Sequence, residues 1–202
     1  MVNMSSVKSS ILGFYEFLRL APLYILFFFV KRKQGLIEEL NTWYSVLPIS
    51  SWRKKKDWKS FAILFLRLKE YRSLVYCRLH WNASKPNVFR WIYPPQPTLY
   101  LGDSSRLGGN VVIQHGFSTI INCESIGANC QIWQNVTIGV AKSGGGKPKI
   151  GQNVKICANS VVLGPIKIGN NVTIGASSVV IRDIPDGCTV VGNPARIIDK
   201  LC

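Results

Sequence analysis

The chain has 202 residues, with 25 Lys and Arg against 10 Asp and Glu, a formal net charge of +15, and 6 cysteines. This length is enough for one substantial domain and a smaller one. The cysteines show neither CxxC pairs nor zinc-ligand spacing, which argues against a disulfide framework and predicts reduced, mostly buried thiols.

The positive charge is concentrated in the first half, where residues 1–98 hold 16 of the 25 Lys and Arg but only 5 of the 10 Asp and Glu. A basic and aromatic-rich half predicts an anionic partner, such as an acidic membrane face, a phosphorylated ligand or a nucleic acid. No nucleic-acid recognition motif accompanies the charge, so we do not expect nucleic-acid binding.

An apolar stretch, LAPLYILFFFV, covers residues 20–30 and is followed by KRK. It is too short for a membrane-spanning helix, which needs about 20 residues. No small-residue cleavage site follows, which argues against a signal peptide. Its amphipathic character and flanking basic residues favour an interfacial or inter-subunit helix.

From residue 58 to residue 81 the apolar spacing is helical. The stripe at three- and four-residue steps consists of Phe61, Leu64, Phe65, Leu68, Tyr71, Val75 and Leu79. Asp57 stands directly before this run as a helix start. NASKPN and YPPQP then break the chain, because proline removes a donor and restricts its neighbour. We therefore predict an α-helical region over 1–97, membrane-associated or oligomerising, and a second domain over 98–202.

Beyond this boundary the apolar period becomes six. The residues in one frame are Ile126, Ile132, Ile138, Ile150, Ile156, Val162, Ile168, Ile174 and Val180. Leu101, Leu107 and Ile113 share an upstream frame, with a one-residue slip before Ile126. A fixed period of six predicts a parallel β-helix, in which three strand-and-turn units close one coil. An ordinary β-sandwich would show period-two alternation instead.

Two features of the repeat region stand out, a glycine-rich insertion and a histidine. Between Ile138 and Ile150 stands GVAKSGGGKPK, whose three consecutive glycines predict a flexible loop protruding over 139–149. His115, in VVIQHGFSTIIN, takes the third place of its hexad, so we expect its imidazole outside the prism. His80 is expected to pack on its helix. Two histidines are too few for a three-histidine zinc site, and we predict no metal.

Five segments together resemble a known family: IQHGFSTII, IWQNVTIG, KSGGGKPKIG, VKICANSVVLGPIKIGNNVTIGASSVV and DIPDGCTVVGNPARII. They are similar to the core of serine O-acetyltransferases and of related sugar and capsule O-acetyltransferases of the hexapeptide-repeat superfamily. The resemblance implies a mainly β fold, a left-handed parallel β-helix preceded by an α-helical N-terminal domain. It also implies a homotrimer or dimer of trimers, with active sites between adjacent prisms.

The resemblance implies roles for individual residues. His115 would be the general base toward acetyl-CoA and a hydroxyl acceptor, with Gln114 before it and Asp103 orienting it. An amide near Gly139 would stabilise the oxyanion. The residues assigned to acetyl-CoA binding are Gly139, Val140, Lys147, Ala158, Ala176 and Arg196. Asp57 and Gln134 would contact the acceptor.

Departures from serine acetyltransferases bear on the acceptor. Gln114 stands where that branch has Asp, Tyr100 where its orienting aspartate falls by gapless alignment, and Gly146 and Lys147 where an Arg-His pair grips the serine carboxylate. Each lost charge-assisted contact removes about 1.5–3 kcal/mol. We therefore expect a sugar hydroxyl of a bacterial surface polysaccharide or its precursor as acceptor. The alternatives are serine O-acetyltransferase and a non-catalytic hexapeptide scaffold. The expected location is cytoplasmic, peripheral on the inner face of an anionic membrane.

Overall fold

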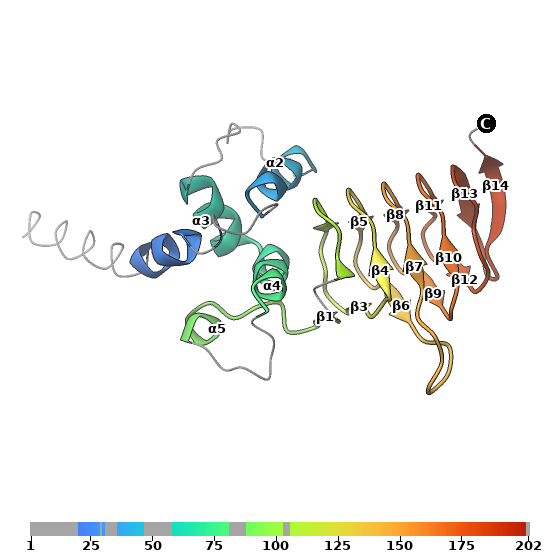
Figure 1. Cartoon of the computed structure of the whole chain (residues 1–202), viewed down its shortest axis with the longest axis horizontal. Coiled ribbons are helices and arrows are strands. Elements are labelled where there is room, and N and C mark those ends of the chain that lie inside the picture. The colour runs from blue at the N-terminus through green and yellow to red at the C-terminus, as the bar shows by residue number, and fades with distance from the viewer. Residues whose placement is uncertain are drawn as a thin grey trace, which may run out of the picture.

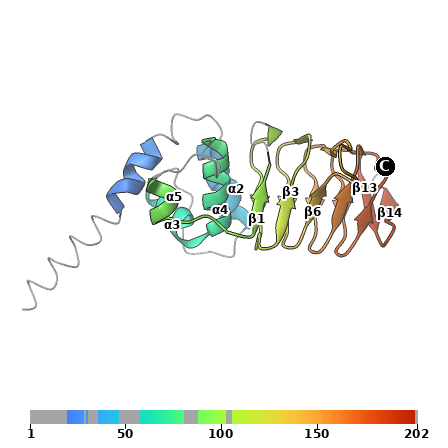
Figure 2. The same ribbon diagram turned by 90° about the horizontal axis from the view of Figure 1, so that it is seen from below.

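The computed structural model describes residues 20–28, 30, 36–46, 58–80, 88–102 and 106–200. Helices form one end of the molecule, and a column of short strands runs from them to the C-terminus (Figures 1 and 2). Helical spacing in the first half and a period of six in the second thus fold as the sequence predicts. Asp57 and Asp103 lie outside the described residues.

The helical part contains a helix over residues 20–28, α2 (Leu36–Val46), α3 (Trp58–Arg67), α4 (Lys69–Arg78) and α5 (Val88–Ile92). The single predicted stripe over 58–81 is wrong in one respect, because the helix breaks at Leu68, which has an extended φ of −111° and ψ of 107°. The break lets both helices share one aromatic core. Phe61 packs on Tyr71 with ring centroids 6.1 Å apart, and Phe65 on Tyr76 at 5.6 Å.

The strands are β1 (Leu99–Leu101), β2 (Val112–Ile113), β3 (Thr119–Ile121), β4 (Ser125–Ile126), β5 (Gln131–Ile132), β6 (Thr137–Gly139), β7 (Lys149–Ile150), β8 (Lys155–Ile156), β9 (Val161–Leu163), β10 (Lys167–Ile168), β11 (Thr173–Ile174), β12 (Val179–Val180), β13 (Cys188–Val191) and β14 (Arg196–Lys200). They form three sheets that are the faces of a triangular prism. Face A is β1-β3-β6-β9-β12, face B is β4-β7-β10, and face C is β2-β5-β8-β11-β13. Pairing is parallel throughout, except that β14 runs antiparallel to β13 at the end of face C.

The register confirms the six-residue frame. On face C, Ile132 pairs with Ile156 and Ile156 pairs with Ile174, so residues at the same hexad position stack in successive coils. The nine aliphatic residues of the frame are all buried, with at most 4% of any side chain exposed. Stacking therefore makes one continuous aliphatic column, while neighbouring coils satisfy each other's backbone hydrogen bonds.

Asparagines hold the corners between faces B and C. Asn129, Asn153 and Asn171 have positive φ angles of 59°, 58° and 57°, a conformation that asparagine tolerates better than most residues. Their side-chain amides form a ladder, in which Asn129 donates to Asn153 at 3.2 Å and Asn153 donates to Asn171 at 3.0 Å. The corners are thus fixed by the same repeat that fixes the core.

The six-residue spacing of the prism is broken at several corners, and two of these breaks lengthen the chain between strands. From Ile113 to Ile121, the corner between faces C and A is two residues longer than the equivalent corner from Ile132 to Ile138, and His115 and Gly116 are the extra residues. The next corner is one residue shorter, which explains the one-residue slip in the sequence. The second departure is the predicted loop after β6, which protrudes from the prism (Figure 1).

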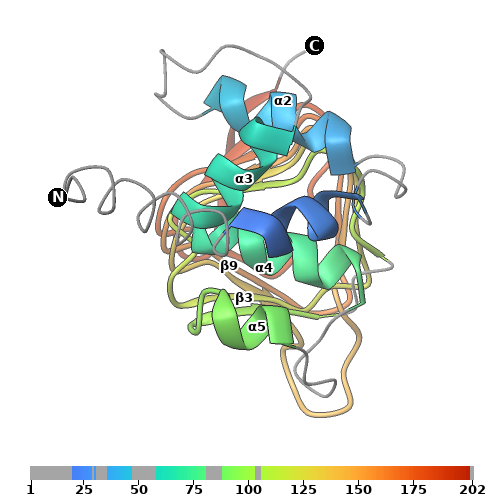
Figure 3. The same ribbon diagram turned by 90° about the vertical axis from the view of Figure 1, so that its left-hand side faces the viewer.

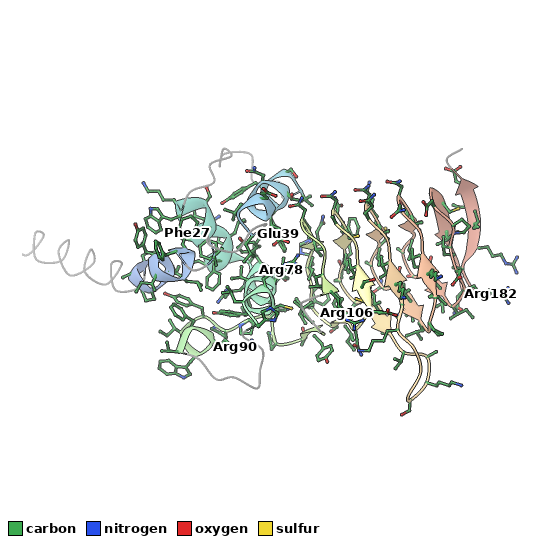
Figure 4. The ribbon with its side chains drawn as sticks, in the orientation of Figure 1. Phe27, Glu39, Arg78, Arg90, Arg106 and Arg182 are labelled. Carbon is green, nitrogen blue, oxygen red and sulfur yellow. The ribbon has the colours of Figure 1, made fainter. Side chains whose placement is uncertain are left out.

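The side chain of Arg78 joins the helices to the first coil. Arg78 of α4 donates to Glu39 of α2 at 2.6 Å and to the carbonyl oxygens of Leu107 and Gly108 (Figure 4). Burial raises the pKa of Glu39 despite the nearby guanidinium. Trp43 of α2 adds a hydrogen bond from its indole N–H to the carbonyl oxygen of Val111 at 3.2 Å. The helical part therefore closes one end of the aliphatic column.

Two expectations from composition can be compared with the described residues. The cysteines among them are free thiols, and Cys123, Cys130 and Cys188 are buried as predicted. None of the described helices has the combination of length and apolar character needed to cross a membrane.

Candidate active site

The histidine of the extended corner stands outside the prism, as predicted. His115 is exposed and has a positive φ of 49°, and its carbonyl oxygen accepts a hydrogen bond from the Phe117 N–H at 2.7 Å. Gly116 is buried instead. A Cβ added to Gly116 would lie 2.7 Å from Cγ2 of Ile113, so only glycine fits without a shift. The imidazole of His115 is thus exposed to solvent, while the neighbouring Gly116 is tightly packed.

The Glu70 side chain from the helical part approaches this corner at Gly116. The same added Cβ on Gly116 would lie 3.1 Å from Cγ of Glu70, in the first turn of α4. The other acidic residues in the described part of the chain lie elsewhere: Glu38 and Glu39 on α2, Glu124 at the loop corner, Asp183 and Asp186 in the last coil, and Asp199 on β14. Glu70 is therefore the described acidic residue at the His115 corner, and no sequence signal distinguishes it.

Several predicted site residues line the edge of the prism that starts at this corner. Backbone hydrogen bonds connect Asn135 to Phe117 (3.1 Å), Asn159 to Gln134 (3.1 Å), and Ser177 to Ala158 (2.9 Å). Gln134, Ala158 and Ala176 consequently occupy equivalent corner positions in successive coils. The Gln134 Oε1 atom is buried and has no hydrogen-bond partner. The edge thus carries Phe117 and Gln134 in the coils near His115 and the small residues Ala158 and Ala176 in the later coils.

The same edge ends at the C-terminal segment. Val179 of β12 donates to the carbonyl oxygen of Gly192 at 2.9 Å, and Ala195 donates to that of Val179 at 2.8 Å. Arg196 begins β14 directly after this crossing and is exposed. An exposed guanidinium at the end of this edge can bind a phosphate group.

The glycine loop lies at a different corner, between faces A and B. It borders a pocket of about 410 Å³, lined by Arg106, Cys123, Glu124, Gly145, Gly146 and Lys147. Arg106 donates to the carbonyl oxygen of Glu124 at 3.1 Å, and the Glu124 carboxylate pairs with Lys149 at 3.0 Å. Burial raises the pKa of Cys123 to about 11, so this thiol is protonated at neutral pH. The pocket lining thus combines two cationic side chains, Arg106 and Lys147, with the Glu124 carboxylate.

The structure separates the predicted site residues into two groups. Gln114, His115, Gln134, Ala158 and Ala176 lie along the edge between faces C and A, and Arg196 lies near its end. Gly139 ends β6, and Val140 and Lys147 belong to the loop that follows it, at the edge between faces A and B. Within one chain, face A stands between the imidazole and the loop. The sequence analysis did not name Glu70 or Arg106.

The fold and this geometry can be compared with known proteins. The family model described as Bacterial transferase hexapeptide (six repeats) matches residues 147–182. No curated protein matches the chain. Solved structures do match it, and the prism is accordingly a left-handed parallel β-helix built from hexapeptide repeats.

The similar structures are serine acetyltransferases. That of Neisseria gonorrhoeae has 27% identity and a TM-score of 0.62, covering 81% of this chain and 64% of its own. The soybean apoenzyme has 27% identity and a TM-score of 0.63, covering 81% and 67%. The enzyme of Brucella abortus strain S19 in complex with coenzyme A has 28% identity and a TM-score of 0.60, covering 81% and 66%.

The comparisons show the fold class of the chain and the group of enzymes to which it is similar. The chain is a hexapeptide-repeat protein of the left-handed β-helix type. Within that class it is similar to acetyltransferases of the serine O-acetyltransferase-like branch, as its sequence motifs predict. It spans 64% of the length of the gonococcal protein.

Proposed function

We propose that the protein is an acetyl-CoA-dependent O-acetyltransferase. The observation that carries this proposal is the exposed imidazole of His115 on the edge whose later coils carry Ala158 and Ala176. Ala158 and Ala176 leave the backbone of that edge accessible to an extended ligand, and Arg196 stands near its far end. The edge therefore suits the pantetheine arm and phosphates of coenzyme A, which is bound in the similar Brucella abortus enzyme.

In this proposal His115 acts as the general base. Its neutral imidazole takes the proton of the acceptor hydroxyl while the oxygen attacks the thioester carbonyl carbon of acetyl-CoA. The tetrahedral intermediate then expels the CoA thiolate, which receives the proton from the imidazolium. The products are the O-acetyl ester and free CoA. Imidazole suits this step because histidine is the side chain that most readily accepts and releases a proton near neutral pH.

Glu70 supplies negative charge near the imidazole. The Glu70 Cγ atom lies beside Gly116, the neighbour of His115, and in this proposal the carboxylate favours the imidazolium that forms during proton transfer. Glu70 thus acts as a positioning and electrostatic residue, a role that the sequence analysis gave to Asp103.

The complete site requires a second copy of the chain. His115 and the glycine loop occupy different edges of one prism, so a loop beside the imidazole must come from a neighbouring protomer. A homotrimer, or a dimer of trimers, brings the face C–face A edge of one copy against the face A–face B edge of the next. The amide near Gly139 and the side chain of Lys147 would then come from the neighbour.

L-serine is the acceptor that the similar proteins favour over a polysaccharide sugar, since they are serine acetyltransferases. The loop pocket contributes a further argument. Arg106 and Lys147 both line it, and two cations can bind a serine carboxylate in place of the missing Arg-His pair. A neutral sugar hydroxyl is the second candidate, favoured by Gln114 where serine acetyltransferases carry an aspartate.

The test is release of free CoA thiol from acetyl-CoA with L-serine, beside nucleotide sugars and capsule oligosaccharides. We expect turnover with serine, and Arg106→Ala should raise the KM for serine while leaving the KM for acetyl-CoA unchanged. Turnover with sugars only would establish the second candidate. No release with any hydroxyl acceptor would contradict acetyl transfer and favour a non-catalytic scaffold. The proposed location is the cytoplasm, and the predicted membrane contact stays a prediction.

A further inference from the structure

Two helices at one end of the molecule expose large apolar side chains. The exposed fractions are 58% for Tyr24, 53% for Ile25 and 54% for Phe28 on the helix over 20–28, and 61% for Val88, 84% for Trp91 and 43% for Ile92 on α5. Figures 1 and 3 show both helices at the end of the molecule farthest from the last coil. We call these six side chains the aromatic end.

Contacts on the inner side of α5 fix which residues point outward. Tyr76 of α4 donates its hydroxyl to the carbonyl oxygens of Phe89 and Tyr93, at 3.0 and 2.9 Å. The Tyr93 ring packs on Phe65 with centroids 5.8 Å apart, and the Arg90 guanidinium lies 5.5 Å from the centre of the Tyr76 ring. The helix is therefore held by Phe89, Arg90 and Tyr93, so its exposed residues contribute little to holding it.

The helix over 20–28 is anchored in the same way. Leu23 and Leu26 are fully buried, and Phe27 packs on Phe61 of α3 with centroids 5.6 Å apart. Tyr24 touches the edge of Trp58 but keeps more than half of its surface exposed. An anchored helix with aromatic and aliphatic residues on its outer side has the composition of an interfacial helix.

Positive charge accompanies the aromatic end. Lys59, next to the Trp58 that touches Tyr24, is exposed, and so are Arg67 and Lys69 at the junction of α3 and α4. Lys31, Arg32 and Lys33 directly follow the apolar stretch in sequence. Residues 1–98 carry 16 of the 25 basic residues of the chain and only 5 acidic ones. A surface that combines exposed aromatic rings with excess cations is complementary to an anionic lipid bilayer.

We infer that the aromatic end docks peripherally on an anionic phospholipid bilayer, with Trp91 and its neighbours at the level of the headgroups. A second copy of the chain fits this surface less well, because two facing copies would bring like charges together. Docking at this end points the prism away from the membrane. The His115 corner, which α4 touches, then lies nearer to the lipid surface than the last coils do. The inference does not depend on acetyl transfer.

Flotation of the full chain with lipid vesicles tests this inference. We expect binding to vesicles of phosphatidylglycerol and phosphatidylcholine at low salt, little binding to phosphatidylcholine alone, and weaker binding as salt is raised. The double variant Trp91→Ser/Ile92→Ser should lower the partition coefficient at least about tenfold. The matched control is Ile197→Ser/Ile198→Ser, which removes two exposed isoleucines from β14 at the opposite end and should bind like the unaltered chain.

A second measurement tests whether Trp91 itself touches the bilayer, with a variant that keeps most of the binding. Bilayers with brominated acyl chains quench tryptophan fluorescence on contact, and Trp91→Phe should reduce the quenched fraction while retaining most of the binding. Three results would overturn the inference: no flotation of the unaltered chain with anionic vesicles, equal flotation of the Trp91/Ile92 variant, or an unchanged quenched fraction in Trp91→Phe. A fall in oligomeric mass of the double variant, with flotation unchanged, would assign the surface to contacts between copies.

Discussion

The prism and the helical part of this protein are stabilised in different ways. In the prism each inward residue meets its own equivalent in the next coil, as Ile132, Ile156 and Ile174 do on face C. In the helical part no position repeats, and individual side chains join it to the prism, among them Arg78, which also pairs with the buried Glu39, and the Trp43 indole.

This difference determines where function can be recognised. Against a regular repeat, the extra residues His115 and Gly116 and the loop after β6 stand out as features that the core does not need. The helical part has no repeat to compare with. The residues that it contributes to the site and to a membrane surface can therefore be recognised only from contacts in the structure. Substitutions can separate the residues that stabilise the fold from the residues that take part in acetyl transfer.

The largest effect is expected from His115→Ala. The imidazole is exposed and supports no packing, so stability should stay unchanged while acetyl transfer falls about 100- to 10,000-fold, with acetyl-CoA affinity largely kept. Steady-state kinetics and thermal unfolding measure the two quantities. His80→Ala is the control among the two histidines and should retain full turnover. An active His115→Ala enzyme would contradict the assignment of the base.

A large loss of stability is expected at the junction. Arg78→Met leaves the buried Glu39 carboxylate without its cation, which should cost about 3–5 kcal/mol of unfolding free energy. Urea unfolding monitored by tryptophan fluorescence measures this loss. Arg182→Met, at an exposed arginine of the last coil (Figure 4), is the matched control and should change stability little. Equal stability of both variants would show that the junction does not depend on the ion pair.

A smaller kinetic effect is expected from Glu70→Gln. Removing the charge beside the His115 corner should lower kcat about 10- to 100-fold, because a charge-assisted contact contributes about 1.5–3 kcal/mol. The KM for acetyl-CoA should stay unchanged, and Glu70→Asp should recover part of the loss. Glu38→Gln on α2 is the control. A change in stability without a change in kcat would make Glu70 a packing residue only.

The smallest effect concerns buried thiols and alkaline pH. Burial raises the pKa of Cys123 and Cys130 to about 11, above the ordinary thiol value of 9.0. Unfolded thiols ionise from about pH 9 while the folded ones stay protonated, so their contribution to stability is complete below pH 9 and is lost as pH rises toward 11. Cys123→Ala should therefore lose less stability between pH 8 and pH 10, by about 1 kcal/mol, than the unaltered chain. Equal pH dependence in both would contradict the raised pKa.

The prism could be predicted from the sequence because a six-residue period corresponds to one strand and one turn of a parallel β-helix. The six-residue frame gave the core residues, the parallel pairing and the exposed place of His115, since a residue's position in the hexad decides which way it points. The slip before Ile126 was visible as well. Its structural cause, a corner two residues longer followed by one residue fewer, required the register of face A.

The helical part could be predicted only in outline. The stripe of apolar residues is continuous through Leu68, and only packing of aromatic rings from both sides reveals why the helix breaks there. Glu70 contacts Gly116 across a distance of 46 positions in the sequence, which no local pattern encodes. For the same reason α5 and its exposed Trp91, lying between two proline-containing segments, were not expected.

The central claim is that the functional site combines the His115 edge of one copy with the loop of a neighbour. Co-expression of His115→Ala with a variant lacking loop residues 142–146 tests it, because each parent carries one intact half of the site. Mixed assemblies, verified by native mass spectrometry, should recover acetyl transfer that neither parent shows alone. Mixed assemblies without turnover would place the complete site within a single chain and contradict the account.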